Sequence, residues 1–280
     1  MATPPLGSLG IIVLTVATFT LQPARAYPQQ PPTYDFDPAV PGVQGPTSPL
    51  LANPFTHFFR TISVNVPLLV PAAELQAALP PGFNALPDAL GRASINALFS
   101  FMVTDAEQAP LMPYHTLVLL AGARNTTLAR NETLVLARFN STQESVDAQN
   151  LTTGGGAWLA DFEWEIAEKR GELEIGVEVD SEEIGLGLRV AATGPSAMNQ
   201  RIKFDPNASR FRWLDAGVAL NSFCVGSTFD QRAVTSTPTN IEVIAKQGRL
   251  ELPGGFSVAV LGPGSAFVFQ KGQVVYLDWE

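Results

Sequence analysis

The clearest pattern in the chain is an alternation of hydrophobic and polar residues at 171–180, GELEIGVEVD. Leu173, Ile175, Val177 and Val179 share one face of this segment, and four acidic residues occupy the other. A period of two is typical of a β-strand with one buried and one solvated face. We therefore predict a strand here and interpret its acidic row as a solvated surface rather than a metal site.

Similar β-type runs recur at short intervals along the chain. They lie at residues 60–68, 92–103, 115–121, 133–139, 187–192, 201–204, 210–214, 241–246, 249–252, 256–261, 266–270 and 273–277. Glycine-containing turns separate the later runs, at 254–255, 262–264 and 271–272. One helix is predicted at 71–79, because Pro71 suits a first helical turn and Pro80-Pro81-Gly82 ends it.

This order of elements predicts the fold class. Strand follows strand without intervening helices, which excludes a doubly wound α/β fold. The expected fold is mostly β, an antiparallel barrel or sandwich with one short helix near the start. No repeat of fixed period is visible, so a single folded domain is the simplest organisation.

The N-terminal region has the composition of a processing signal. An apolar run at 9–21 is followed by Ala24-Arg25-Ala26, a small-residue cleavage pattern, so residues 1–26 are interpreted as a secretory signal peptide. No basic residue precedes the apolar run, which leaves a retained membrane anchor as the alternative. Residues 27–54 are rich in proline and predicted to form an extended arm. The folded domain is expected at 55–280, in the secretory pathway or outside the cell.

The composition and modification signals agree with that location. Five Asn-x-Ser/Thr sequons predict glycosylation, at Asn125, Asn131, Asn140, Asn150 and Asn207. The single cysteine, Cys224, lies in an apolar context and is interpreted as a buried thiol, so a large core must stabilise the domain. The net charge of −9 argues against nucleic acid or anionic lipid as a partner.

The residue inventory excludes several kinds of chemistry. The chain has two histidines, His57 and His115, so a three-histidine zinc site cannot form, and neither HExxH nor paired cysteines occur. There is no Gly-x-Ser-x-Gly elbow for a serine hydrolase and no glycine-rich nucleotide loop. We therefore expect neither a metal nor a cofactor.

The segment 154–164, GGGAWLADFEW, resembles the lysine segment of the acetoacetate decarboxylase superfamily, Gly-x-Pro-Lys-x-Leu-Ala-x-Phe-x-Trp. The residues in register are Gly154, Leu159, Ala160, Phe162 and Trp164. Residues 60–67 and 75–83 resemble the family's first strand and helix exit, while 184–193, 248–252 and 274–276 are similar to later strands. The resemblance spans most of 55–280 and implies the family's β-rich fold.

The resemblance also implies three catalytic roles. In the family a lysine with a lowered pKa forms a Schiff base, an arginine orients the departing carboxylate, and a glutamate assists proton transfer. Here Arg60 matches the arginine, whereas Thr116 stands in the glutamate position and Ala157 in the lysine position. Lys169 lies nearby in a charged turn and is expected to be solvated. With this register a Schiff-base mechanism is excluded.

Three hypotheses follow from this pattern. The first is a decarboxylase-like lyase acting on a keto acid or polyketide-type molecule, with Arg60, Tyr114, His115 and Thr116 around a pocket near Ala157. His115 would be the general base in that arrangement. The second is a non-catalytic secreted protein that uses the same fold to bind an apolar ligand. The third is a β-sandwich unrelated to the family; the oligomeric state, including a homo-oligomer, is left open.

Overall fold

A computed structural model describes residues 57–104, 113–153, 155–169, 171–195, 210–215, 218–228, 240–264 and 268–278. All of them belong to one of two units into which the contacts divide the chain, Phe36–Glu280. The predicted signal peptide and the proline-rich arm lie outside the described residues. Among the residues that are described, no helix has the length and apolar character needed to cross a membrane.

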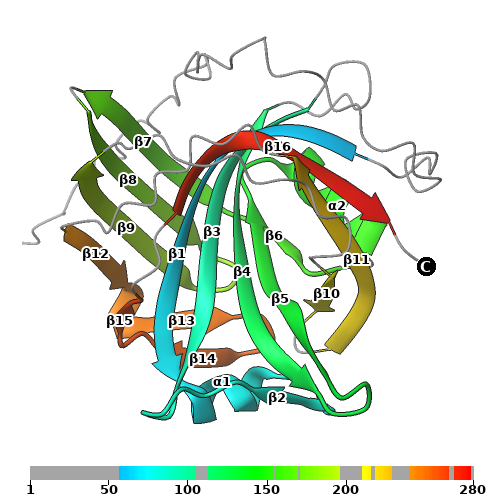
Figure 1. The fold of residues 1–280 in the computed structure, drawn as a ribbon. Coiled ribbons are helices and arrows are strands. Elements are labelled where there is room, and N and C mark those ends of the chain that lie inside the picture. Colours follow the sequence, from blue (N-terminus) through cyan, green and yellow to red (C-terminus); the bar gives the residue numbers. More distant parts are fainter. Residues whose placement is uncertain are drawn as a thin grey trace, which may run out of the picture. The chain divides into compact units, whose positions relative to one another are not determined.

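Most of the strands belong to one large curved sheet (Figure 1). Its ten strands are β1 (His57–Pro71), β2 (Phe83–Ala85), β3 (Arg92–Thr104), β4 (Tyr114–Asn125), β5 (Arg130–Asn140), β6 (Ala157–Leu159), β10 (Arg210–Asp215), β11 (Val218–Thr228), β15 (Gly262–Pro263) and β16 (Val268–Asp278). The pairings lead from β4 through β3, β1, β16, β11, β10 and β5 back to β4. Most are antiparallel, but β5 pairs in parallel with β6 and β10.

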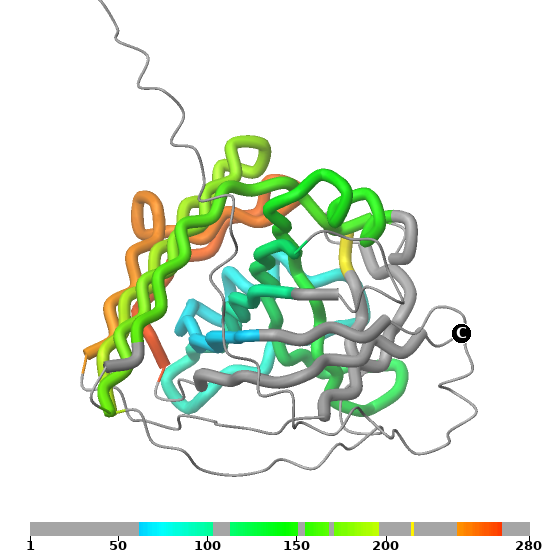
Figure 2. The backbone as a smooth tube through the Cα atoms, turned by 90° about the horizontal axis from the view of Figure 1, so that it is seen from above, coloured from blue at the N-terminus to red at the C-terminus, as the bar shows by residue number. Residues whose placement is uncertain are grey.

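A second sheet forms a separate layer beside the large one (Figure 2). It contains β7 (Asp161–Lys169), β8 (Glu172–Ser181), β9 (Leu186–Pro195) and β12 (Asn240–Ala245), in the order β12-β9-β8-β7. A two-stranded hairpin, β13 (Arg249–Leu252) with β14 (Phe256–Ala259), adjoins it, and a 3₁₀ turn, η2 (Lys246–Gly248), connects β12 to β13. The predicted mostly β fold is confirmed.

The alternation at 171–180 gives β8 as predicted. Leu173, Ile175, Val177 and Val179 are at most 3% exposed, while the acidic face is open to solvent in large part. Within the described residues no group of acidic, histidine or cysteine side chains is arranged to hold a metal ion.

The helices agree with the sequence pattern only in part. The predicted helix forms α1 (Ala72–Ala78), with Pro71 at its N-terminal boundary and Leu75 and Ala78 buried. A second helix, α2 (Gln143–Thr153), was not predicted. Its sequence, QESVDAQNLTT, has no strong apolar stripe, so the periodicity that reveals most helices is absent.

Two predicted strands near the C-terminus are one strand. Lys271-Gly272 had been interpreted as a turn, but β16 runs through it, and Gly272 pairs with Thr61 of β1. The turn prediction is therefore wrong, because a glycine within a strand can continue a ladder that neighbouring strands enforce. Strands β7 and β11 were not among the predicted runs, and the run at 201–204 lies outside the described residues.

The central strands of the large sheet are buried on both faces. One face, here called the core face, carries Ile62, Val64, Phe99, Leu117 and Phe139, each fully buried. The opposite face, here called the polar face, carries Ser63, Asn65, Ser100, Thr116, Arg138 and Asn140. Adjacent residues of a strand point to opposite faces, so this division follows from the strand register.

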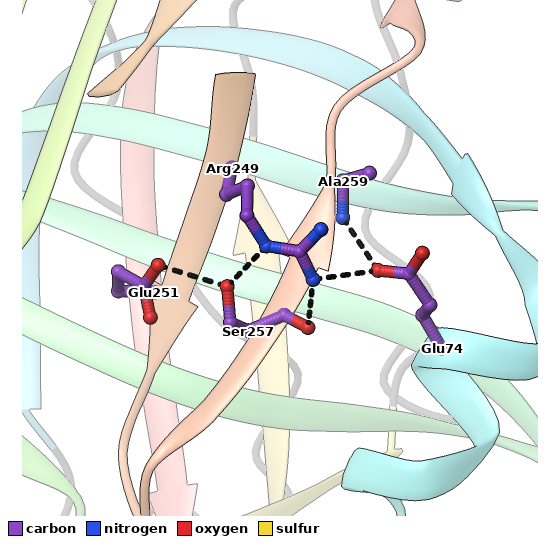
Figure 3. A network of polar contacts seen from close by, with 5 residues as sticks. All are labelled: Glu74, Arg249, Glu251, Ser257 and Ala259. Atoms are coloured by element: carbon purple, nitrogen blue, oxygen red, sulfur yellow. Dashed lines mark hydrogen bonds and ion pairs between the residues drawn. The ribbon is translucent and has the colours of Figure 1, made fainter. Parts of the chain in front are cut away.

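A polar network fastens α1 to the hairpin β13–β14 (Figure 3). The Arg249 guanidinium donates to Glu74 Oε2 at 2.8 Å and to the Ser257 hydroxyl at 2.7 Å. The Ala259 amide also donates to Glu74 Oε2, at 2.9 Å, and this bond is the main reason that the pKa of Glu74 is lowered. The network links residues that are far apart in sequence and closes one end of the fold.

Candidate functional site

The polar face centres on a buried arginine, Arg138 of β5, which is 1% exposed. Arginine is almost never fully buried unless hydrogen bonds or an opposite charge compensate its lost hydration. Four uncharged side chains accept hydrogen bonds from this guanidinium. They are Tyr114 and Thr116 of β4, Asn140 of β5, and Gln149 of α2.

The geometry of these bonds fixes the plane of the guanidinium. Arg138 Nε donates to Thr116 Oγ1 at 3.2 Å and to Asn140 Oδ1 at 3.1 Å, and Nη2 donates to the Tyr114 hydroxyl at 3.1 Å. Nη1 donates to Gln149 Oε1. The side chain is therefore held from three sides by two strands and a helix, which is the preorganisation that an anion-binding group needs.

Hydroxyl and amide groups form a row across the polar face at one level. Ser63, Ser100, Thr116 and Asn140 are successive direct partners across β1, β3, β4 and β5. All four are at most 5% exposed, and the two serine hydroxyls are 2.8 Å apart. The row is polar and almost entirely shielded from solvent.

Two amide atoms on the polar face have no hydrogen-bond partner. They are Nδ2 of Asn140, a donor, and Oδ1 of Asn65, an acceptor, and both are shielded from solvent. A buried polar atom without a partner costs about 1–3 kcal/mol. Buried polar atoms of this kind can be completed by water or by a ligand.

The segment with the family resemblance lies directly beside Arg138. Ala157 of β6 is the direct partner of Arg138 in the parallel pair, and the Arg138 amide donates to the Gly156 carbonyl at 3.2 Å. Paired residues of neighbouring strands share a face, so Ala157, 5% exposed, lies next to Arg138 on the polar face. Position 157, which the sequence resemblance assigned to a lysine, therefore lies on the strand next to Arg138.

Helix α2 secures β6 through an asparagine side chain. Asn150 Nδ2 donates to the Ala157 carbonyl at 3.0 Å, and the Ala157 amide donates to Asn150 Oδ1 at 2.9 Å. The neighbouring residue, Gln149, contacts Arg138. Two consecutive side-chain amides of α2 therefore have different partners: Gln149 positions the Arg138 guanidinium, and Asn150 positions β6.

Glycines allow the turn before β6 to approach β10 closely. Gly156 has φ +83°, and a Cβ there would lie 2.5 Å from the Leu214 carbonyl oxygen. A Cβ on Gly155 would lie 2.7 Å from Asp215 Oδ2. The proline position of the family segment is therefore occupied by a residue that this backbone requires to be glycine.

His115 belongs to the opposite side of the sheet. Its ring lies among Phe101, Phe162 and Trp164, with ring centroids 4.9, 5.8 and 5.4 Å away. Burial lowers the pKa of His115 to about 4, so the imidazole is neutral at physiological pH. Its Nε2 and the Trp164 Nε1 are buried without a partner, in the layer between the two sheets.

The structure therefore divides the predicted site residues. Tyr114 and Thr116 come together on Arg138, and Ala157 is the partner of Arg138 on the next strand, whereas His115 points into the core and does not join the cluster. Arg60 lies in β1, paired with Val103 and Gln273, and its side chain is outside the described part of the structure. Lys169 ends β7 opposite Glu172, and its side chain is likewise not described.

The sequons also differ in their surroundings. Asn140 is fully buried, Asn125 is 6% exposed and donates to Glu132 Oε1 at 3.2 Å, and Asn150 holds Ala157. Asn131 has an exposed side chain on β5. Asn207 lies outside the described residues.

The sequence did not indicate Arg138 or Gln149 as site residues. It indicated Asn140 only as a glycosylation sequon. One signal was available: Arg138 interrupts the apolar run LVLARF, in a segment predicted to be a buried strand. A charge within such a run must be compensated by polar groups from other strands. Gln149 carried no comparable signal, because its contact depends on α2.

Comparison with known proteins agrees with this fold. The structure is similar to an acetoacetate decarboxylase-like enzyme from Sphingomonas wittichii RW1, with 13% identity, a TM-score of 0.50, and coverage of 81% of this chain and 94% of that chain. It is also similar to acetoacetate decarboxylase from Legionella pneumophila, with 11% identity, a TM-score of 0.51, and coverage of 80% and 85%. No family model and no curated protein matches the sequence. The likeness shows a shared fold.

Proposed function

We propose that this chain is a decarboxylase-like lyase for a keto acid or polyketide-type acid, working without a Schiff-base lysine. The observation that carries the proposal is the buried Arg138 guanidinium, which four side chains hold by hydrogen bonds on the face that it shares with Ala157. A guanidinium in a shielded site binds a carboxylate strongly and with a defined orientation. Arg138 thus takes the orienting role that the sequence assigned to Arg60.

The chemistry needs only polarisation of a carbonyl group. When a β-keto acid loses carbon dioxide, the bond between the carboxylate carbon and the α-carbon breaks, and its electrons form an enolate on the neighbouring carbonyl. Hydrogen-bond donors fixed at the developing oxyanion lower the barrier. Arg138 holds the carboxylate, the Asn140 amide supplies a donor at the developing oxyanion, and a proton from water completes the product. Enolisation and dehydration have the same electrostatic requirement.

The second candidate is non-catalytic binding of a small acid. Two observations favour it: position 157 offers no nucleophile, and His115, the expected general base, faces away from Arg138. In either case the ligand is a small organic acid, and we propose a secretory location from the N-terminal signal and the exposed sequon at Asn131.

A ligand panel with Arg138 variants tests the proposal. Purified full chain is assayed with β-keto acids for carbon dioxide release and for thermal stabilisation. We expect Arg138→Lys to weaken and Arg138→Met to abolish both effects, while the matched control Arg124→Met, at an exposed site on β4, leaves them unchanged. Circular dichroism checks that each variant folds.

The outcomes separate the two candidates. Carbon dioxide release that depends on Arg138 supports the lyase, and stabilisation without release supports the binding protein. Stabilisation that persists in folded Arg138→Met contradicts both. Borohydride with substrate is expected to trap no lysine adduct, and a trapped adduct would contradict the lysine-free mechanism.

A further inference from the structure

The two unpartnered amide atoms of the polar face offer complementary bonds to a ligand. Asn140 Nδ2 is a donor beside the Arg138 guanidinium, since the other amide atom of Asn140 accepts from Arg138 at 3.1 Å. Asn65 Oδ1 is an acceptor on β1. A donor next to a cation suits an anionic group, whereas an isolated acceptor suits a hydroxyl or N–H group.

The strand register places these atoms at two ends of a strip across the sheet. Asn65 pairs with Leu98, Leu98 with Val118, and Val118 with Arg138. Direct partners share a face, so two apolar side chains lie between the acceptor and the cation. Leu98 and Val118 pack in one hydrophobic cluster with Leu120 and Val135.

The length of this strip sets the size of the ligand. The backbones of Asn65 and Arg138 are three strand spacings apart, but the Arg138 guanidinium bonds to Tyr114 and Thr116 of β4. The two binding groups are therefore about two strand spacings apart, roughly 10 Å along the sheet. A four-carbon keto acid, with bonds of roughly 1.5 Å, cannot reach from one to the other. An acid with an aliphatic chain of about ten atoms can, because each bond advances it by a little more than 1 Å.

We propose that the polar face binds an elongated acid with a polar far end. Its anionic group lies at Arg138 and Asn140, its apolar middle lies on Leu98 and Val118, and a terminal hydroxyl or N–H donates to Asn65 Oδ1. This inference rests on the proposed function, in which Arg138 binds the acid, and adds the length and the far-end chemistry of that acid. It makes Asn65 a specificity-determining residue at a distance from the reacting group.

Three acids test the inference: freshly prepared acetoacetate, decanoate and ω-hydroxydecanoate, with affinity measured by thermal shift and calorimetry on the full chain. We expect ω-hydroxydecanoate to bind about tenfold more tightly than decanoate, the equivalent of one hydrogen bond of about 1.4 kcal/mol. Acetoacetate should bind more weakly than either. Asn65→Leu should remove the preference for the hydroxyl without changing the affinity for decanoate.

Two further variants test whether the preference for the hydroxylated acid depends on the acceptor oxygen of residue 65. Asn65→Asp keeps an acceptor oxygen and should keep the preference, which provides a test if Asn65→Leu does not fold. Asn96→Leu, on β3 of the same sheet, is the matched control and should leave the preference intact. Loss of the preference in Asn96→Leu, or its persistence in folded Asn65→Leu, overturns the inference.

The result also distinguishes this inference from the function on which it rests. If Arg138→Met loses all three acids but the wild type does not favour the hydroxylated acid, the elongated-ligand inference is wrong and the proposed function stands. If Arg138→Met binds the acids as the wild type does, the proposed function fails, and the inference fails with it.

Discussion

Arg138 of β5 and Ala157 of β6 are direct neighbours in a parallel strand pair, and the Arg138 amide donates to the carbonyl that precedes Ala157 at 3.2 Å. An arginine on the adjacent strand therefore lies next to Ala157, the position that the sequence resemblance assigned to a lysine. A guanidinium does not form an imine with a ketone, but it can bind and orient an anion. The site therefore has a positive charge at Arg138 and no nucleophile at Ala157.

This relationship predicts the effect of restoring the lysine. Ala157→Lys places a second cation beside Arg138 in a buried position, so we expect a stability loss of about 1–3 kcal/mol from overpacking and charge repulsion. The matched control Leu159→Lys, at a position 44% exposed on the same strand, should change stability by less than about 0.5 kcal/mol. Denaturant unfolding measures both. Equal losses in the two variants would show that position 157 is not buried beside the cation.

His115 makes stability depend on pH. Its pKa in the folded chain is about 4, below the ordinary value of 6.5, because burial disfavours the charged ring. The unfolded chain therefore binds more protons between these values, and stability falls as the pH is lowered from about 6.5 towards 4. The slope from this group is at most about 1.4 kcal/mol per pH unit.

The variant His115→Phe isolates that contribution. A phenyl ring fits the aromatic surroundings and does not titrate, so the difference in unfolding free energy between variant and wild type should change between pH 6.5 and pH 4 and stay constant above pH 7. Unfolding curves at a series of pH values give the difference. A difference that is independent of pH would show that His115 is not buried as a neutral ring.

The sequons allow a test of surface exposure in a secretory host. We expect the glycan within the described region to be carried by Asn131, whose side chain is exposed, and not by Asn140, which is fully buried. Peptide mass spectrometry after glycosidase treatment reports occupancy at each sequon. Asn131→Gln should remove the modification from residues 113–153, and a glycan found on Asn140 of the folded, secreted chain would contradict the placement.

The sequence predicted most of the fold because its strands bury one face and expose the other, as in β8 with Leu173 and Glu174. It also directed attention to the segment around Ala157, because the spacing of Phe162 and Trp164 resembles a known motif. The sequence did not predict α2, because this helix is only weakly amphipathic. Tertiary contacts stabilise it, such as the hydrogen bond from Asn150 to the Ala157 carbonyl. The structure separates His115 from Tyr114 and Thr116, since consecutive strand residues face opposite ways.

The turn before β6 gives a final prediction, in which two glycines of similar backbone geometry differ only in their surroundings. Gly156 has φ +83° and Gly171 has φ +80°, but a Cβ on Gly156 would lie 2.5 Å from the Leu214 carbonyl oxygen, whereas a Cβ on Gly171 would meet nothing within 4 Å. Gly171→Ala should therefore cost about 1–2 kcal/mol, the penalty for a left-handed alanine. Gly156→Ala should cost clearly more, because β6 must also move away from β10, and it should weaken acid binding by displacing Ala157 and Arg138. Unfolding free energies and the affinity for decanoate measure these effects, and equal stability losses in the two variants would mean that the close approach of β6 to β10 is absent.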